Sequence, residues 1–207
     1  MRRYSYYVTL CAALLGLSFA AHAESEVRQI AAKDNPHIQK AQEKAVEIVK
    51  TFTPQEIANL EIVKDGFGII RSVRATGRIV EKTVKQCGKD NPEMKETMTT
   101  GFNEWQGGVM TVLGDKEKAM KAAIADGRFS KPEDVRAFLD IIDKAALKAD
   151  ENRSEAIKIV STPSSCEGLL GTMEESGAKL RELLAAVEFP VAEIKPEPEP
   201  RKAGAHE

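Results

Sequence analysis

The sequence predicts an all-α protein, an up-down antiparallel bundle of four main helices preceded by a shorter N-terminal helix. Three observations lead to this fold class. Apolar residues recur at spacings of three and four, and no convincing segment alternates apolar and polar residues as a half-buried strand would. The chain is rich in Ala, Glu, Lys, Leu and Ile and poor in aromatic residues. A capping residue followed by proline recurs, which is typical of helix starts.

The first 23 residues have the pattern of a secretory signal peptide. A basic and polar opening, MRRYSYY, is followed by the apolar run VTLCAALLGLSFAA and by the small residues of Ala21-His22-Ala23. The run is shorter than the roughly 20 residues that a membrane span needs, although an uncleaved anchor is the alternative. We expect cleavage after Ala23 and a periplasmic or secreted protein with no integral membrane span.

The charge of the predicted mature chain excludes two classes of partner. Loss of Arg2 and Arg3 lowers the 30 basic residues to 28, against 32 acidic residues that all remain. Signs are interspersed, so there is no basic stripe of the kind that binds nucleic acid or anionic lipid. We expect one helical domain over 24–189 and a disordered Pro/Glu-rich tail over 190–207.

The first helix is predicted over 36–51. Asp34 or Asn35 can cap it, and Pro36 lies in the first turn, where a missing N–H costs nothing. One face of this helix carries an apolar stripe, made of Ile38, Ala41, Ala45, Ile48 and Phe52.

The second helix is predicted from 54 to about 87, opened by the capping box Thr53-Pro54-Gln55-Glu56. Gly66 and two further glycines each cost about 1 kcal/mol relative to alanine inside a helix. They indicate either close approach of a neighbouring element or a break near Asp65-Gly66. The predicted apolar seam is Ile62, Gly66, Ile69, Val73, Thr76, Val80, Thr83 and Cys87.

Three more helices complete the predicted bundle. One runs over 92–126, capped by Asn91 and broken or kinked at Gly114-Asp115. The next is opened by the capping box at 130–133 and can extend to Val160. The last starts at about residue 165, after the turn at 161–165, and ends at Phe189-Pro190.

The tetrapeptide KDNP occurs at 33–36 and at 89–92. After the first copy the next capping box starts at Thr53, and after the second it starts only at Ser130, so the two units do not superpose. We interpret the copies as two helix starts that use the same local chemistry, with duplication of a functional unit as the alternative.

Cys87 and Cys166 are predicted to form a disulfide. In an up-down layout the end of the second helix and the start of the last helix fall at the same pole. An oxidising compartment favours a bridge between two remaining cysteines. A redox or metal thiol pair is the competing interpretation, but neither cysteine lies in a C-x-x-C motif.

The sequence offers no recognisable catalytic or cofactor motif. It lacks the C-x-x-C-H haem attachment motif, a phosphate-binding loop and the G-x-S-x-G elbow. Zinc sites need several Cys or His ligands at short, defined spacing. The predicted mature chain has only His37 and His206, which are far apart in sequence. Haem held by His37 and a methionine is conceivable, but methionines on helices are more often core residues. We therefore expect no catalytic residues, no metal, no cofactor and no enzymatic activity.

The segment 101–110, GFNEWQGGVM, is the first candidate for ligand or partner binding, and the KPEPEP stretch of the tail, as a semi-rigid spacer, is the second. Phe102 and Trp105 are large apolar groups, and Gly107 and Gly108 beside them open space for a docking helix or ligand. Alternatively, the two aromatic residues fill the core and the glycines admit a neighbouring helix.

These observations favour a non-catalytic accessory module that binds an envelope or extracellular protein, in the manner of a chaperone. A small-ligand carrier with an apolar cavity near Phe102 and Trp105 is the alternative, and an enzyme built from carboxylates is the third hypothesis.

Overall fold

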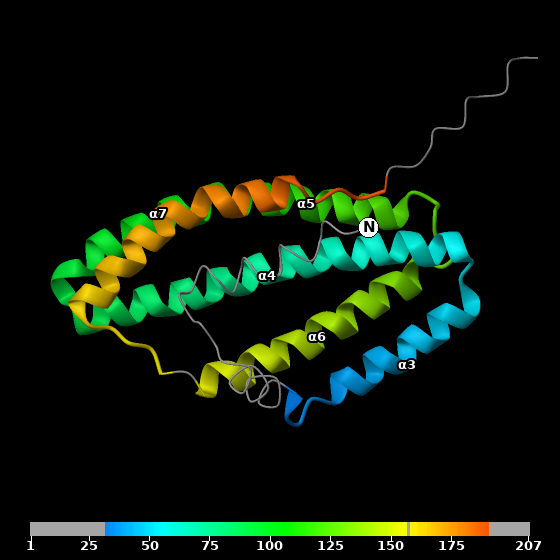
Figure 1. Ribbon diagram of the computed structural model, residues 1–207, viewed down its shortest axis with the longest axis horizontal. Helices are drawn as coiled ribbons and strands as arrows, with labels where there is room; N and C mark the ends of the chain where they lie inside the picture. Colours follow the sequence, from blue (N-terminus) through cyan, green and yellow to red (C-terminus); the bar gives the residue numbers. More distant parts are fainter. Residues whose placement is uncertain (1–31, 157, 191–207) are drawn as a thin grey trace, which may run out of the picture.

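The computed structural model describes residues 32–156 and 158–190 and confirms an all-α bundle. The predicted signal peptide and almost all of the predicted tail lie outside the described residues. Helices that follow one another along the described chain run antiparallel (Figure 1). They are α3 (Pro36–Thr51), α4 (Pro54–Asp90), the 3₁₀ turn η1 (Pro92–Met94), α5 (Lys95–Ala125), α6 (Pro132–Ala156) and α7 (Pro163–Ala185).

Two of the predicted caps form as expected. Thr53 Oγ1 accepts the Glu56 N–H at 3.3 Å, and the Glu56 carboxylate accepts the Thr53 N–H at 2.8 Å, so the capping box that opens α4 is complete. Asn35 caps α3, because its Oδ1 accepts the His37 N–H at 3.3 Å.

The second KDNP copy differs from the prediction. The Asn91 side chain makes no cap hydrogen bond, and a 3₁₀ turn separates it from α5. Its buried amide instead donates to the carbonyls of Cys87 at 3.1 Å and Ser161 at 2.9 Å. Asn35 likewise donates across the fold, to the Ala145 carbonyl at 2.7 Å. The two asparagines therefore share a role that the repeat did not predict, which is to tie a helix start to a distant segment.

Helix α4 is continuous over 37 residues, which excludes a break at Asp65-Gly66. A Cβ at Gly66 would lie 2.5 Å from the Phe189 ring. The glycine therefore allows Phe189 to approach the α4 backbone closely, which is one of the two explanations that the sequence offered for it. The predicted seam is wrong at Ile62, which is 46% exposed, and at Thr76, which is also exposed, since the buried face runs through Leu60, Val63 and neighbours. A break at Gly114-Asp115 is also excluded, because α5 continues through it to Ala125.

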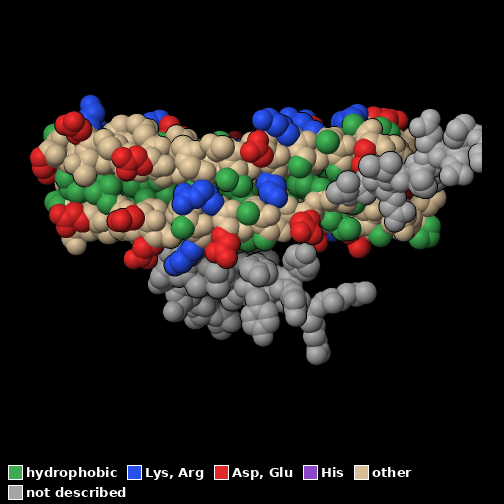
Figure 2. Space-filling model, turned by 90° about the horizontal axis from the view of Figure 1, so that it is seen from above, with side chains coloured by type: hydrophobic (Ala, Val, Ile, Leu, Met, Phe, Trp, Pro, Cys, Tyr) green, Lys and Arg blue, Asp and Glu red, His purple; other side chains and the backbone are tan. Residues whose placement is uncertain are grey.

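The helices form two groups that share α4. Helices α5 and α7 lie side by side along one edge of the molecule, α4 lies in the middle, and α6 and α3 lie at the other edge (Figure 1). Viewed from the α5/α7 edge, apolar side chains gather between the helices while acidic and basic side chains intermingle on either side (Figure 2). Among the described elements, helix α3 packs chiefly against α6.

The Cys87–Cys166 disulfide closes one pole of the bundle and confirms the predicted pairing. The two Cα atoms are 5.9 Å apart, and both side chains are fully buried. The bridge joins residues 79 positions apart in sequence, where it fixes the C-terminal end of α4 against the first turn of α7.

Glu56 closes the opposite pole. Its carboxylate accepts the Ser130 N–H at 2.6 Å as well as the N–H and hydroxyl of Thr53, each at 2.8 Å. These hydrogen bonds to the charged form, from the Ser130 backbone first and the Thr53 backbone next, lower the pKa of Glu56 from 4.5 to about 2. One buried carboxylate therefore joins the start of α4 to the segment that precedes α6.

Removal of the disulfide is expected to lower stability without changing the fold. By the chain-entropy model, a bridge that closes a loop of this length stabilises by roughly 4 kcal/mol, less any strain. The variant Cys87→Ala/Cys166→Ala should therefore unfold at a clearly lower urea concentration, measured by circular dichroism at 222 nm. Reductant should lower the midpoint of the wild type to a similar value and leave that of the double variant unchanged. An unchanged wild-type midpoint under reductant would contradict a stabilising bridge.

Glu56 is expected to make stability depend on pH. Because its pKa is lower in the folded chain, it stabilises the fold above pH 4.5, and this contribution is lost as the pH falls from 4.5 towards 2. At neutral pH, Glu56→Gln should lower the free energy of unfolding by roughly 2–3 kcal/mol. The gap between wild type and variant in urea titrations should close near pH 2. A gap that stays constant with pH would assign the loss to packing.

Candidate functional site

The aromatic pair of the predicted site lies in the core. Phe102 and Trp105 are 7% and 6% exposed, and their ring centroids are 6.0 Å apart in a stacked arrangement. The Trp105 Nε1–H donates to the Ser176 hydroxyl on α7 at 3.3 Å. The indole thus has a polar partner within the chain, as buried tryptophans usually do, and both rings help to hold α5 against α7.

Side chains of α7 and α5 occupy most of the space that the glycines leave. A Cβ at Gly108 would lie 2.9 Å from Nη1 of Arg181, and one at Gly177 would lie 3.2 Å from Cδ1 of Trp105. Gly107 is exposed and has no atom within 4 Å of its Cβ position. Gly108 and Gly177 therefore admit a neighbouring helix, while Gly107 faces open space.

A groove of about 560 Å³ lies elsewhere, between α3 and α6. It will be called the α3/α6 groove. Its lining is almost wholly apolar and dominated by alanine. The residues are Ala32, Asn35, Ile38, Ala41, Gln42, Ala45, Phe138, Ile142, Ala145, Ala146 and Ala149. A smaller hollow, on the exposed side of α5 and η1, is lined by Pro92, Lys95, Glu96, Thr99 and Thr100.

The groove follows from the periodicity of its two helices. On α3 the lining residues recur at steps of three and four from Ile38 to Ala45, and on α6 they recur in the same way from Phe138 to Ala149. These spacings put each set on one helix face. Because the antiparallel helices contribute mainly alanine here, their small side chains leave a trough. Ile38 remains 37% exposed at its edge.

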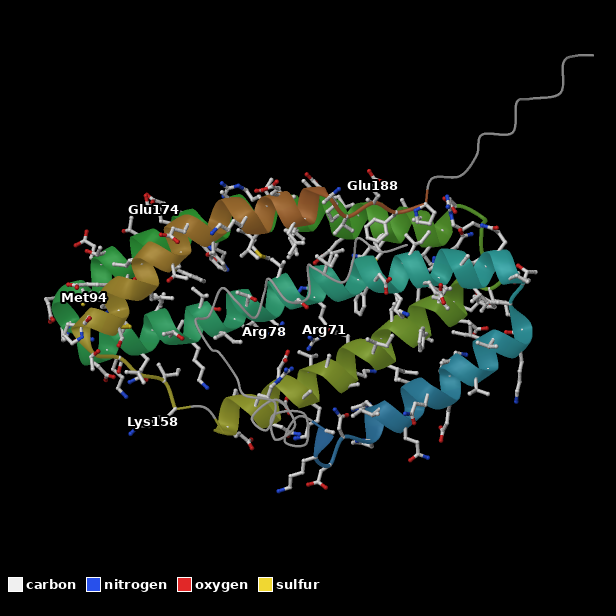
Figure 3. The ribbon with its side chains drawn as sticks, viewed as in Figure 1. Arg71, Arg78, Met94, Lys158, Glu174 and Glu188 are labelled. Carbon is white, nitrogen blue, oxygen red and sulfur yellow. A yellow bond between two sulfur atoms is a disulfide. The ribbon has the colours of Figure 1, made fainter. Side chains whose placement is uncertain are left out.

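An arginine cluster lies between α4 and α6, where the side chains of Arg71 and Arg78 leave α4 (Figure 3). Asp150 of α6 accepts from Arg71 at 2.6 Å, from Arg78 at 3.3 Å and from Arg153 at 2.7 Å. Nε of Arg71 lies 3.4 Å from Asp143 and makes no hydrogen bond. Three guanidinium groups thus face two carboxylates, which leaves one positive charge in excess.

Exposure divides the cluster into a buried and an open part. The Arg71 side chain is 11% exposed, which requires the paired carboxylates around it because an unpaired buried charge is costly. Arg78 and Arg153 are 43% and 40% exposed, so part of each guanidinium faces solvent.

Within residues 32–156 and 158–190, no group of three or more His, Cys, Asp or Glu side chains could hold a metal ion. No described helix is both long and apolar enough to cross a membrane. His37 is half-buried at the start of α3.

No protein-family model matches this chain, and no curated protein or solved structure is significantly similar to it. The function must therefore be inferred from the chain's own residues.

Sequence reasoning predicted neither the α3/α6 groove nor the arginine cluster between α4 and α6. The groove could have been predicted from Ala145, Ala146 and Ala149, because three alanines within five residues of a helix leave a shallow face. The arginine cluster could not, since Arg71 and Asp150 are 79 positions apart in sequence and lie close only once α4 and α6 pack.

Gly107 is expected to contribute nothing to packing. Because its Cβ position is open, Gly107→Ala should raise the free energy of unfolding by up to about 1 kcal/mol through helix propensity. Gly177→Ala is the matched control and should destabilise, since its Cβ would press on Trp105. Urea titrations followed by fluorescence of Trp105, the single tryptophan, measure both. A lower free energy of unfolding for Gly107→Ala would indicate that the glycine itself is required at this position.

Proposed function

We propose that this protein is a non-catalytic interaction module of the periplasm or extracellular space, and that the α3/α6 groove receives an apolar helix of a partner protein. The observation that carries the proposal is the lining of the groove, two antiparallel helix faces with almost no polar surface. Recognition of an amphipathic helix by an apolar groove is a recurrent mode of protein binding.

Packing within the chain supports this use of the groove. Helices α4, α5 and α7 contact one another, so each buries an apolar face between two neighbours. Helix α3 has one principal neighbour among the described elements, α6, and part of its apolar stripe, including Ile38 and Ala45, lines the groove. A third helix laid along α3 and α6 would bury that stripe and complete a three-helix unit.

The compartment is inferred from two independent features. The first 23 residues have the pattern of a secretory signal, and the Cys87–Cys166 bridge is of a kind that persists in oxidising environments. An envelope or extracellular partner follows from this placement.

A small-ligand carrier is the second candidate. The groove volume of about 560 Å³ falls within the roughly 300–1,000 Å³ typical of ligand pockets. A native mass spectrum of the protein from its own compartment separates the two. Extra mass of a few hundred daltons that is lost on activation would favour the carrier, and a bare chain would turn the search to protein partners.

A pair of surface substitutions tests the groove. Ile38 and Val46 are both exposed apolar residues of α3, but only Ile38 lines the groove. Ile38→Glu should abolish capture of the partner from an extract of the native compartment, because a carboxylate cannot be buried unpaired. Val46→Glu should leave capture intact. Both variants should keep the wild-type melting temperature to within a few degrees, since surface changes usually cost little. Equal capture by both variants would overturn the proposal.

A further inference from the structure

We propose that the partner helix received by the α3/α6 groove carries an acidic group at the end that lies over Arg153. This inference rests on the proposed function and specifies the chemistry of the partner. It follows from where the groove ends on α6 and from the charges found there.

The groove ends beside the arginine cluster. Arg153 follows Ala149, the last lining residue of α6, by four residues, so it lies on the same helix face one turn further on. The start of α3 is fixed at this same end. Asn152 donates to the Lys33 carbonyl at 2.7 Å, and Ala32 is part of the lining.

The charges at this end favour an anion. Antiparallel α3 and α6 place opposite ends of their macrodipoles there, and these nearly cancel. The charged side chains therefore determine the electrostatic potential at this end of the groove. Asp150 is shared by three arginines, and Glu151 lies 3.5 Å from Lys148. Among the described residues Arg153 pairs with one carboxylate, that of Asp150, and keeps 40% of its side chain exposed. The exposed part of the Arg153 guanidinium therefore lies where the groove opens.

The described residues that line the groove carry no charge. Between Ala149 and Phe138 the lining residues of α6 are all apolar, and on α3 only Asn35 and Gln42 are polar. At the far end Lys44 is already held by Asp134 at 2.8 Å and Glu47 at 3.0 Å. A complementary helix is thus apolar along its contact face and acidic at one end.

A second copy of this chain fits the groove less well. A two-fold dimer would oppose the groove to itself, and two troughs cannot fill one another. A partner helix supplies the ridge that the trough lacks. Self-association remains an outcome that the experiment below detects.

Two synthetic peptides test the charge preference. Both form an amphipathic helix of about 14 residues with one leucine–alanine face, roughly the length of α3. One ends in two glutamates with a free carboxylate, and the other ends in two lysines with an amide. Fluorescence anisotropy of each labelled peptide with the purified protein gives two dissociation constants. We expect the acidic peptide to bind roughly fivefold or more tightly than the basic one at low salt.

Substitutions locate the preference. Arg153→Glu should reverse it, whereas Lys144→Glu, the same charge change on an exposed residue of α6 that does not line the groove, should leave it unchanged. The ratio of the two constants is the readout, because a general loss of stability would weaken both peptides alike. Ile38→Glu should abolish binding of both.

Each failure has a distinct meaning. Equal binding of both peptides that Ile38→Glu abolishes would overturn the acidic preference and leave the groove as a helix site. Absence of binding by both peptides would overturn the helix site as well. A dimer in the native mass spectrum that Ile38→Glu converts to a monomer would assign the groove to a second copy and overturn this inference.

Discussion

Helix α4 packs against both groups of helices, and the rest of the structure depends on how it does so. It contacts α5 and α7 and fully buries aliphatic side chains such as Val63 and Ile70. It meets α6 through Arg71, whose buried guanidinium is held by Asp143 and Asp150. A buried charge requires its ion-pair partners in one defined geometry. The Arg71 contact therefore positions α6, and with it α3, relative to α4.

The two poles of the bundle are closed by different chemistry. Cys87 and Cys166 join α4 to α7 covalently, while Glu56 joins the start of α4 to Ser130 through hydrogen bonds. The covalent pole belongs to the α4/α5/α7 group, and the hydrogen-bonded pole connects that group to α6. This division leaves α3 as the most peripheral helix, attached chiefly through α6, which is why the open apolar surface occurs there.

Local signals in the sequence were sufficient for the helices and for the disulfide. The Thr53-Pro54 pair determines where α4 starts. The alternating direction of the helices brings Cys87 and Cys166 to the same pole, where they form the disulfide. Signals that depend on packing were not sufficient. Ile62 was placed in the seam because its spacing fits, yet it is 46% exposed among the described residues. Gly114 lies inside an unbroken helix despite the cost of a helical glycine. Phe102 and Trp105 stood out in the sequence because of their size, and the structure uses that size to pack α5 on α7.

The Asn-Pro order within each KDNP copy affects the rate at which the asparagine can deamidate. Asn35 and Asn91 each hold a distant carbonyl with a side-chain amide, and conversion of that amide to a carboxylate would replace the donor with a repelling charge. Spontaneous deamidation begins when the backbone nitrogen of the following residue attacks the asparagine side chain. Proline has no N–H with which to complete that attack. The proline that follows each asparagine therefore also protects its amide from deamidation by this route.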